Sequence, residues 1–349
     1  TMKEIDSLAF SGNTSIKEIS DLSELDGLYI AYGAFSGCTS LTGDIVLPEN
    51  VKGGFESFKG TAITSVKIPA SAFLESDDAP DSMFDNCKSL ERVELEEGLK
   101  VIGNFMFRSC TKLESIVIPN SLVDYKTFGY EAFSDCTGLK SITIPENMKK
   151  MPGGLFNGCA FESVTIPKGM GDEVWISTFG GNAANARNSS FARNENLKKI
   201  TISEGVTSLG YCVFEYDKNV EEIYVYSKDL ALVEPKSSQY ASFDKNANPT
   251  YYVYKGSKSE ETLKKSGYLT DENTVYLLDT EGLKKAIAEA EAIDAALYTD
   301  ESVKVLTDAV EAAKAALDST SVNEVEAATE ALKAAIDALE LKPTTFTVS

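Results

Sequence analysis

The chain has 349 residues, 25% of them charged, and a formal net charge of −21 at pH 7. This acidity argues against nucleic acid and anionic membranes as partners, because Lys and Arg bind their phosphates. The chain contains no histidine, which excludes histidine-based acid–base catalysis and His-ligated metal sites. Its length has room for two domains.

A repeated phrase, Phe-x-x-Cys-x-x-Leu-x-x-Ile-x-Ile-Pro, runs through the first part of the chain and is clearest at residues 107–119 and 133–145. The anchoring phenylalanines are Phe10, Phe35, Phe58, Phe84, Phe107, Phe133, Phe156, Phe191 and Phe214, with a degenerate copy at Phe243. From Phe84 to Phe107 the period is 23 residues, and from Phe107 to Phe133 it is 26. Such a period predicts a solenoid of stacked coils that bury their apolar edges against one another.

The second half of each phrase alternates apolar and polar residues. Ile142 and Ile144 point one way while Ser141 and Thr143 point the other, which is the period of a short strand with one buried face. In five coils the strand is stopped by a proline, which donates no ladder hydrogen bond. These prolines are Pro48, Pro69, Pro119, Pro145 and Pro167. One strand per coil predicts a parallel sheet on one flank, with Ser-, Thr- and Gly-rich turns on the other.

These motifs resemble the BspA-like leucine-rich repeat family of bacterial cell surfaces, over about residues 5–270. Residues 251–257 and 263–268 resemble that family's closing coil. Four residues, Asn13, Thr61, Asn194 and Asp217, depart from the pattern where other coils have cysteine. The family is broad in ligand, so the resemblance implies a fold and a location rather than a substrate.

Five of the six cysteines, namely Cys38, Cys87, Cys110, Cys136 and Cys159, occupy the same repeat position, and Cys212 lies two residues before its phenylalanine. Equivalent positions stack in a buried column, where cysteine acts as a small apolar residue. Other residues replace cysteine in some coils, which favours buried free thiols. Disulfides between neighbouring coils remain an alternative, since adjacent strands lie about 5 Å apart.

From residue 280 to 341 the composition shifts to Ala, Glu, Lys and Leu, with apolar residues at intervals of three and four. This pattern predicts three amphipathic helices with breaks at 298–299 and 318–321. Ser321 with Glu324 fits a capping box at the start of the third helix. Three such helices joined by short turns predict an up-down-up bundle.

Residues 325–336 resemble the FIVAR domain, a three-helix module of extracellular proteins of Gram-positive bacteria. That resemblance implies a spacer or sugar-associated module and transfers no binding residue. The predicted chain is α+β overall. Residues 1–278 form a leucine-rich-repeat solenoid with short parallel strands and about nine to ten coils, including the closing coil. A FIVAR-like three-helix bundle follows at 279–342, and a linker at 343–349.

No catalytic, cofactor-binding or metal-binding residue is predicted. The cysteines lack the paired spacing of a zinc site, and no phosphate-binding glycine loop appears. Adjacent acids such as Glu96 and Glu97 could in principle serve a glycosidase, but such pairs on surface turns are usually solvated. We therefore expect no enzyme activity, and treat a glycan-processing enzyme as the weakest alternative.

The first candidate binding surface is the solvent face of the sheet, where outward columns bring Ser141, Thr143, Ser163 and Thr165 together. A flat surface of hydroxyls could bind a protein or a glycan. The alternative is a ladder of Ser and Thr that serves only strand packing and solubility.

The second candidate is an insertion within residues 169–190, which makes the spacing from Phe156 to Phe191 35 residues. Long loops on a rigid scaffold are common binding elements. The insertion holds the only tryptophan, Trp175, and an aromatic side chain with Asn and Arg could stack on a sugar and hydrogen-bond to it. The residues concerned are Trp175, Phe179, Asn182, Arg187 and Asn188. Alternatively, Trp175 fills the gap that the insertion opens.

A third feature is a group of tyrosines late in the array, interpreted as a cap for the last coil rather than an interface. Its members are Tyr211, Tyr216, Tyr224, Tyr226, Tyr240, Tyr251, Tyr252 and Tyr254. No segment is apolar enough to cross a membrane, and no signal peptide begins the chain. We therefore expect a piece of a larger secreted protein of the bacterial surface, with signal, anchor and further domains outside it. Two functions fit, an adhesion or recognition module for host or neighbouring-cell proteins or glycans, and a structural spacer.

Overall fold

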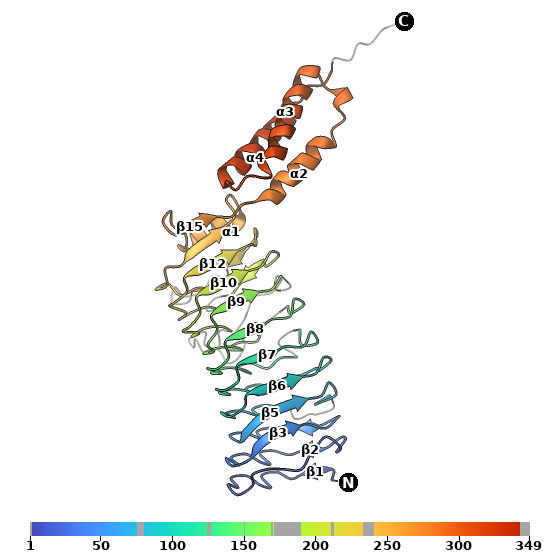
Figure 1. The fold of residues 1–349 in the computed structure, drawn as a ribbon, viewed down its shortest axis with the longest axis vertical. Coiled ribbons are helices and arrows are strands. Elements are labelled where there is room, and N and C mark those ends of the chain that lie inside the picture. Colours follow the sequence, from blue (N-terminus) through green and yellow to red (C-terminus); the bar gives the residue numbers. More distant parts are fainter. Residues whose placement is uncertain are drawn as a thin grey trace. The chain divides into compact units, whose positions relative to one another are not determined.

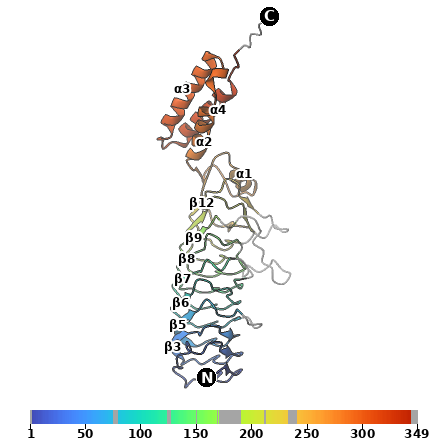
Figure 2. The same cartoon turned by 90° about the vertical axis from the view of Figure 1, so that its right-hand side faces the viewer.

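The computed structural model describes residues 2–74, 80–123, 127–149, 151–168, 170, 190–210, 213–232 and 241–342. The chain divides into two compact units, Thr1–Thr274 and Val275–Ser349 (Figure 1). The first unit is a solenoid whose coils follow one another in chain order, as a view turned by 90° also shows (Figure 2). The predicted linker at 343–349 lies outside the described residues.

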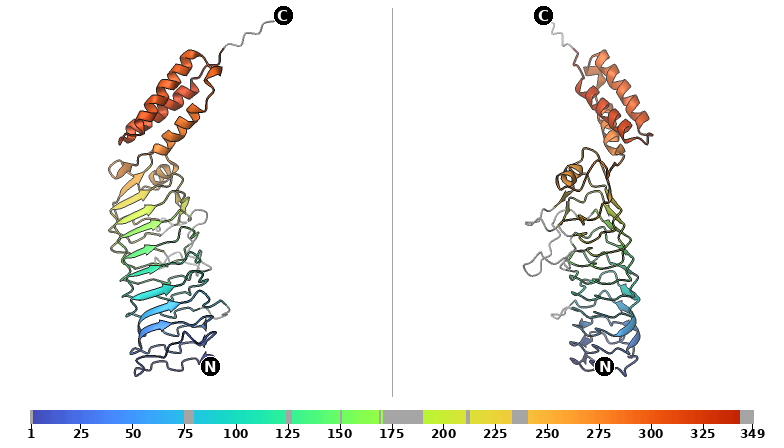
Figure 3. Two further views of the ribbon diagram at one scale, coloured as in Figure 1. Left: turned by 45° about the vertical axis from the view of Figure 1, so that its right-hand side comes forward. Right: turned by 90° about the vertical axis from the view of Figure 1, so that its left-hand side faces the viewer.

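One flank of the solenoid carries the predicted sheet (Figure 3). Its strands are β3 (Thr42–Val46), β5 (Ala62–Ile68), β6 (Arg92–Leu95), β7 (Ser115–Val117), β8 (Ser141–Thr143), β9 (Ser163–Ile166), β10 (Lys199–Ile202), β12 (Glu222–Val225) and β14 (Thr250–Val253). They pair in parallel in the groups β3-β5-β6, β7-β8 and β9-β10-β12-β14, and β15 (Thr274–Tyr276) adjoins β14. Strands β5 and β9 end directly before Pro69 and Pro167, because proline cannot extend the ladder.

The prediction of one strand per coil was incomplete. Several coils form a second short strand before the anchoring phenylalanine. These strands are β1 (Glu4–Ile5), β2 (Tyr29–Ile30), β4 (Lys52–Gly53), β11 (Ser208–Leu209) and β13 (Ala231–Leu232), and they pair in parallel as β1-β2-β4 and β11-β13. Ile30 and Leu209 are fully buried there. The segments are too short for alternation to reveal them in the sequence.

The anchoring phenylalanines form one continuous stack, which confirms the predicted coil register. Successive rings from Phe10 to Phe243 are 5.1–5.8 Å apart between centroids and 3–21° from parallel. The rings of Phe58, Phe84 and Phe107 are fully buried. Each ring between the two ends of the stack therefore packs on both faces, and offset aromatic pairs contribute about 0.5–1.5 kcal/mol beyond area burial.

Tight turns set the direction of each phenylalanine. The residues two before and two after the anchor repeatedly have positive φ, for example Phe105 (56°) and Ser109 (60°) around Phe107. Glycine takes this conformation at the second position in several coils, as at Gly60. Other residues pay about 1–2 kcal/mol for it, so these turns hold backbone strain that the Phe stack offsets.

The repeat cysteines are buried and free, as predicted for Cys38, Cys87, Cys110, Cys136 and Cys159; Cys212 lies outside the described residues. Each described thiol donates a hydrogen bond to the carbonyl of an anchoring phenylalanine one coil earlier, at 3.0–3.4 Å. The interpretation of cysteine as purely apolar was therefore incomplete. Burial raises the pKa of the Cys87 thiol to about 11 and that of Cys136 to about 12.

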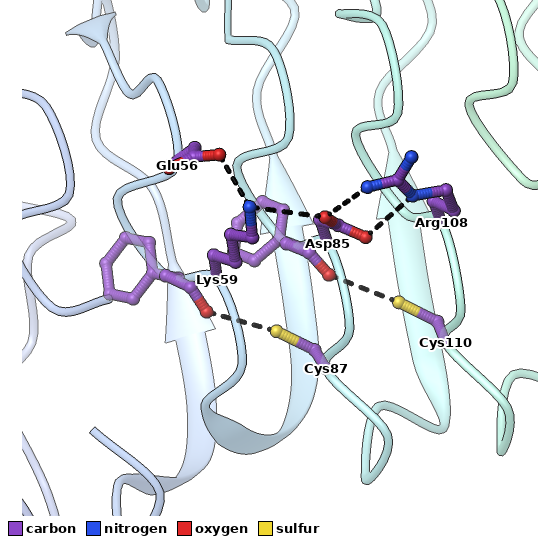
Figure 4. A network of polar contacts seen from close by, with 8 residues as sticks. Glu56, Lys59, Asp85, Cys87, Arg108 and Cys110 are labelled. Carbon is purple, nitrogen blue, oxygen red and sulfur yellow. Dashed lines mark hydrogen bonds and ion pairs between the residues drawn. The ribbon is translucent and has the colours of Figure 1, made fainter. Parts of the chain in front are cut away.

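An ionic clamp joins three successive coils on the turn flank (Figure 4). The Asp85 carboxylate, only 4% exposed, accepts two hydrogen bonds from Arg108, Nη2 to Oδ2 at 2.7 Å and Nε to Oδ1 at 3.1 Å. On its other side lies Lys59, with Nζ 3.6 Å from Oδ2 and 2.6 Å from Glu56. The Arg108 guanidinium also lies 4.4 Å from the Phe105 ring centroid. The three residues of this clamp, Lys59, Asp85 and Arg108, each directly follow an anchoring phenylalanine.

The last coil closes with β14, the helix α1 (Lys258–Lys265) and β15. The N-cap Ser257 accepts a hydrogen bond from the Glu260 N–H, and Leu263 is fully buried. The Tyr268 ring meets Phe243 edge-on at 5.3 Å, and its hydroxyl accepts a hydrogen bond from the Ser242 N–H at 3.0 Å. These contacts cover the end of the Phe stack.

The second unit contains the helices α2 (Thr280–Glu291), α3 (Asp300–Ala316) and α4 (Val322–Asp337), with a 3-10 turn at Ala295–Leu297. All three contribute to one apolar core, including Leu283, Leu306 and Leu332. The Thr299 N–H before α3 donates to the Glu340 carbonyl after α4 at 2.8 Å, which fits the predicted up-down-up order. The capping box forms only in part, because the Glu324 carboxylate accepts from Ser319 rather than from the Ser321 N–H.

Candidate functional site

The solvent face of the sheet, called the sheet face below, consists of the outward side chains of β3 to β14. Strand register places these side chains in two columns. Ser115 lies opposite Ser141 and Val117 opposite Thr143, while Ser163 lies opposite Lys199 and Thr165 opposite Thr201. The columns predicted from the sequence are therefore present across these strands. Three zones of different chemistry follow one another along them.

The charged zone covers β3, β5 and β6 with Asp44, Lys67, Arg92 and Glu94. Lys67 Nζ lies 3.1 Å from Glu94 and 2.9 Å from Glu96, and Arg92 lies 3.8 Å from Asp44. The hydrogen bond to Lys67 lowers the pKa of Glu96, and the same bond raises the pKa of Lys67. A hollow of about 520 Å³ runs over β3, β5, β6 and β7. Its charges already pair with one another.

The hydroxyl zone covers β7 to β9 and brings together the four sequence-predicted residues of the sheet, Ser141, Thr143, Ser163 and Thr165, all of them exposed. Within the described part of the chain, none of these four hydroxyls makes a side-chain hydrogen bond to another protein group. Val117 beside them is 77% exposed. This zone can therefore donate and accept hydrogen bonds around an apolar point.

The aromatic zone covers β10, β12 and β14. The rings of Tyr224 and Tyr252 stack at 4.1 Å and 2°, and Lys199 Nζ lies 4.2 Å from the Tyr224 centroid. The Tyr252 hydroxyl donates to Glu222 at 3.4 Å. The interpretation of the tyrosines as a cap is thus wrong for Tyr224 and Tyr252, whose register opposite one another on β12 and β14 puts them on the sheet face. It holds for Tyr251, which is 2% exposed and meets Phe243 edge-on.

The candidate binding residues of the insertion fall outside the part of the chain that the structure describes. They are Trp175, Phe179, Asn182, Arg187 and Asn188, and their role stays a prediction. Sequence reasoning missed the Lys199–Tyr224 contact. The signal was present, because two residues in neighbouring outward columns on adjacent strands are within reach of long side chains.

Two further kinds of feature, metal-ligand clusters and membrane-spanning helices, are absent from the described part of the chain. No group of three or more Cys, Asp or Glu residues there is arranged to hold a metal ion. None of the described helices combines the length and apolar character that a membrane crossing requires. The surface instead offers hydroxyls, paired charges and aromatic edges on a rigid sheet, which suit reversible binding.

Comparisons with known proteins bear on the repeats. The family model described as "BspA type Leucine rich repeat region" matches six copies, over residues 1–79, 54–174 and 174–236. Solved structures similar to this chain include a leucine-rich repeat protein from Bacteroides ovatus (20% identity, 79% of this chain and 87% of that chain covered, TM-score 0.42). Others are a leucine rich cell surface protein from Faecalibacterium prausnitzii (20%, 64% and 69%, 0.37) and the pneumococcal vaccine antigen PcpA (16%, 78% and 69%, 0.41). A search of the curated proteins found no match.

Proposed function

We propose that this chain, which belongs to the BspA-type leucine-rich repeat family, is a non-enzymatic adhesion or recognition module of a bacterial cell surface. Its ligand in this proposal is a protein or glycan of a host or a neighbouring cell. The extracellular location is part of the proposal and rests on the family resemblance. The observation that carries the binding role is the hydroxyl zone, where Ser141, Thr143, Ser163 and Thr165 are exposed on the neighbouring strands β8 and β9.

The hydroxyl zone suits a polar ligand for a physical reason. Its hydroxyls both donate and accept, so they match the hydroxyls of a sugar or the backbone of a peptide. They belong to short strands held by the stacked core, so little conformational entropy is lost when a ligand orders them. The neighbouring Tyr224 and Tyr252 add apolar area with polar tips, which is common in binding surfaces.

A structural spacer is the second candidate. The charged zone favours it, because Lys67 and Arg92 already pair with acids of the same surface and need no partner. The helices α2, α3 and α4 would then serve as a FIVAR-like extension of the spacer, in keeping with the resemblance of residues 325–336. An enzyme acting on glycans is the weakest candidate, and turnover by the purified chain would establish it.

The test is an array of host matrix proteins and glycans probed with the full chain. The double variant Thr143→Glu with Thr165→Glu introduces two carboxylates into the hydroxyl zone. We expect it to raise Kd about tenfold or more, since desolvating an unpaired carboxylate costs well over 1 kcal/mol. Thr207→Glu is the matched control, because Thr207 is exposed but lies before β11 on another flank.

The outcomes separate the candidates. Loss of binding in the double variant but not in the control supports the sheet face. Binding that survives in the double variant and is lost when residues 169–190 are deleted assigns recognition to the insertion. Failure of the chain to bind any ligand on the array, with its fold intact, makes the spacer the better account.

A further inference from the structure

The position three residues after each anchoring phenylalanine forms a column of hydrogen-bond donors, called the donor column below. In six coils its side chain donates to the anchoring phenylalanine carbonyl one coil earlier, whereas Thr61 donates to the Phe58 carbonyl of its own coil. The pairs are Cys38 with Phe10 (3.0 Å), Cys87 with Phe58 (3.1 Å), Cys110 with Phe84 (3.4 Å), Cys136 with Phe107 (3.1 Å), Cys159 with Phe133 (3.2 Å) and Asn194 with Phe156 (3.1 Å). Asp217 follows Asn194 in this column, and an ionised aspartate has no proton to donate.

The surroundings of Asp217 disfavour a negative charge. The residue is 1% exposed. Its Oδ1 accepts a hydrogen bond from the Asn194 N–H at 2.7 Å, while Oδ2 is buried and has no partner among the described residues. The charged group that faces it from the next coil is Asp244, which has the same sign. No Lys or Arg of the described residues forms an ion pair with it.

We propose that Asp217 is a built-in proton-binding site: in the folded solenoid its Oδ2 carries a proton and donates a hydrogen bond to the Phe191 carbonyl, as six other column members do one coil apart. That carbonyl also accepts from Asn194 Nδ2 of its own coil, and a carbonyl oxygen can accept two hydrogen bonds. Loss of that proton at higher pH leaves a buried, unpaired carboxylate beside Asp244 and loosens this coil. The same coil holds β12, so if the proposed function holds, the loosening acts on the strand that carries Tyr224.

The direction of the pH dependence follows from linkage. Burial, above all, raises the pKa of Asp217 well above its ordinary value of 3.8, and the charge of Asp244 raises it further. The folded state then keeps a proton that the unfolded chain releases. The contribution of the bound proton to the stability of the fold is complete below about pH 3.8. It is lost as the pH rises through the raised pKa of Asp217 in the folded state. Within that window the folding equilibrium constant falls about tenfold per pH unit for one proton.

The test uses the full chain with Asp217→Asn, since an amide has the shape of the acid and donates at every pH. Asp229→Asn is the matched control, because Asp229 is exposed. Amide hydrogen exchange in residues 191–210 and 213–225 is measured for both variants and the parent across pH 4 to 9. The ratio of variant to parent protection at each pH cancels the intrinsic pH dependence of exchange.

We expect the Asp217→Asn ratio to rise by up to about tenfold per pH unit above pH 4 and then to level off, with a flat ratio for Asp229→Asn. Asp217→Cys should behave in the same way, because it introduces the commonest donor of the column. It serves as a second variant in case asparagine disturbs the local packing. A flat or falling ratio for both Asp217 variants, in chains that remain folded, would overturn the proposal, because Asp217 would then be ionised in the native state.

Discussion

Replacing Arg108 with leucine should destabilise the solenoid more than the loss of any surface ion pair. The change removes both hydrogen bonds at 2.7 and 3.1 Å from an Asp85 carboxylate that is 4% exposed. Breaking a buried pair in this way costs about 3–5 kcal/mol. Lys59 at 3.6 Å still opposes the stranded charge, and the Arg108 side chain is itself 33% exposed. We therefore expect a loss of about 2–3 kcal/mol.

A double-mutant cycle isolates the interaction. Asp85→Asn leaves two cations that reach water, so it should cost only about 1 kcal/mol, and the double variant should cost about 1–2 kcal/mol less than the sum of the two. The assay is urea unfolding at pH 7 followed by far-UV circular dichroism, at low salt and at 1 M NaCl. The surface control is Lys112→Leu, since Lys112 and Glu91 are both mostly exposed at 3.4 Å.

Lys112→Leu should lose less than about 1 kcal/mol of stability. Two results would refute the buried-pair interpretation: an Arg108→Leu loss no larger than that of Lys112→Leu, or equal abolition of both losses by 1 M salt. Either result would mean that solvent screens Asp85 as it screens a surface carboxylate.

Two further predictions concern the turns and the thiols. Ser109 has φ of 60°, so Ser109→Gly should stabilise the fold by about 0.5 kcal/mol. The control Ser115→Gly in β7 should destabilise it by a similar amount. Thermal melting compares the two variants, and a loss of stability in Ser109→Gly would contradict the proposed turn strain. Burial raises the pKa of Cys87 to about 11 and of Cys136 to about 12, so alkylation of both at pH 8 should be at least about 100-fold slower in the folded chain than in urea. Mass spectrometry of labelled peptides measures this, and fast native labelling would mean that the column opens readily.

The repeat period made the coil register predictable from the sequence. Equivalent residues of successive coils meet the same surroundings, so the spacing of the phenylalanines was enough to order the stack from Phe10 to Phe243. Alternation within each strand then placed Ser141 and Thr143 outward and Ile144 inward, because side chains in a strand have a period of two. The helical stripes after residue 280 predicted α2, α3 and α4 for the corresponding reason.

The features that the sequence did not reveal depend on pairs of residues rather than on a period. The clamp of Lys59, Asp85 and Arg108 needed opposite charges at one repeat position in three neighbouring coils, and the repeat alignment itself could have shown it. The helix α1 was missed because its eight residues, Lys258–Lys265, carry few apolar side chains and depend on tertiary packing of Leu263. Tyr224 and Tyr252 were grouped with the other late tyrosines as a cap, although alternation had already placed Tyr224 in an outward column and register places Tyr252 beside it.

The donor column makes a last prediction that separates hydrogen bonding from size. Threonine and valine have nearly the same shape, but only threonine can donate to the Phe107 carbonyl as the Cys136 thiol does at 3.1 Å. The position is fully buried, so the difference between Cys136→Thr and Cys136→Val reports the hydrogen bond, about 0.5–1.5 kcal/mol in favour of threonine. Thr61 at the equivalent position of another coil is buried and donates at 2.8 Å to the Phe58 carbonyl of its own coil, so the column accommodates a hydroxyl. Urea unfolding of the two variants measures the difference. A valine variant as stable as the parent and more stable than threonine would mean that the column selects for small apolar residues, and that its hydrogen bonds are incidental.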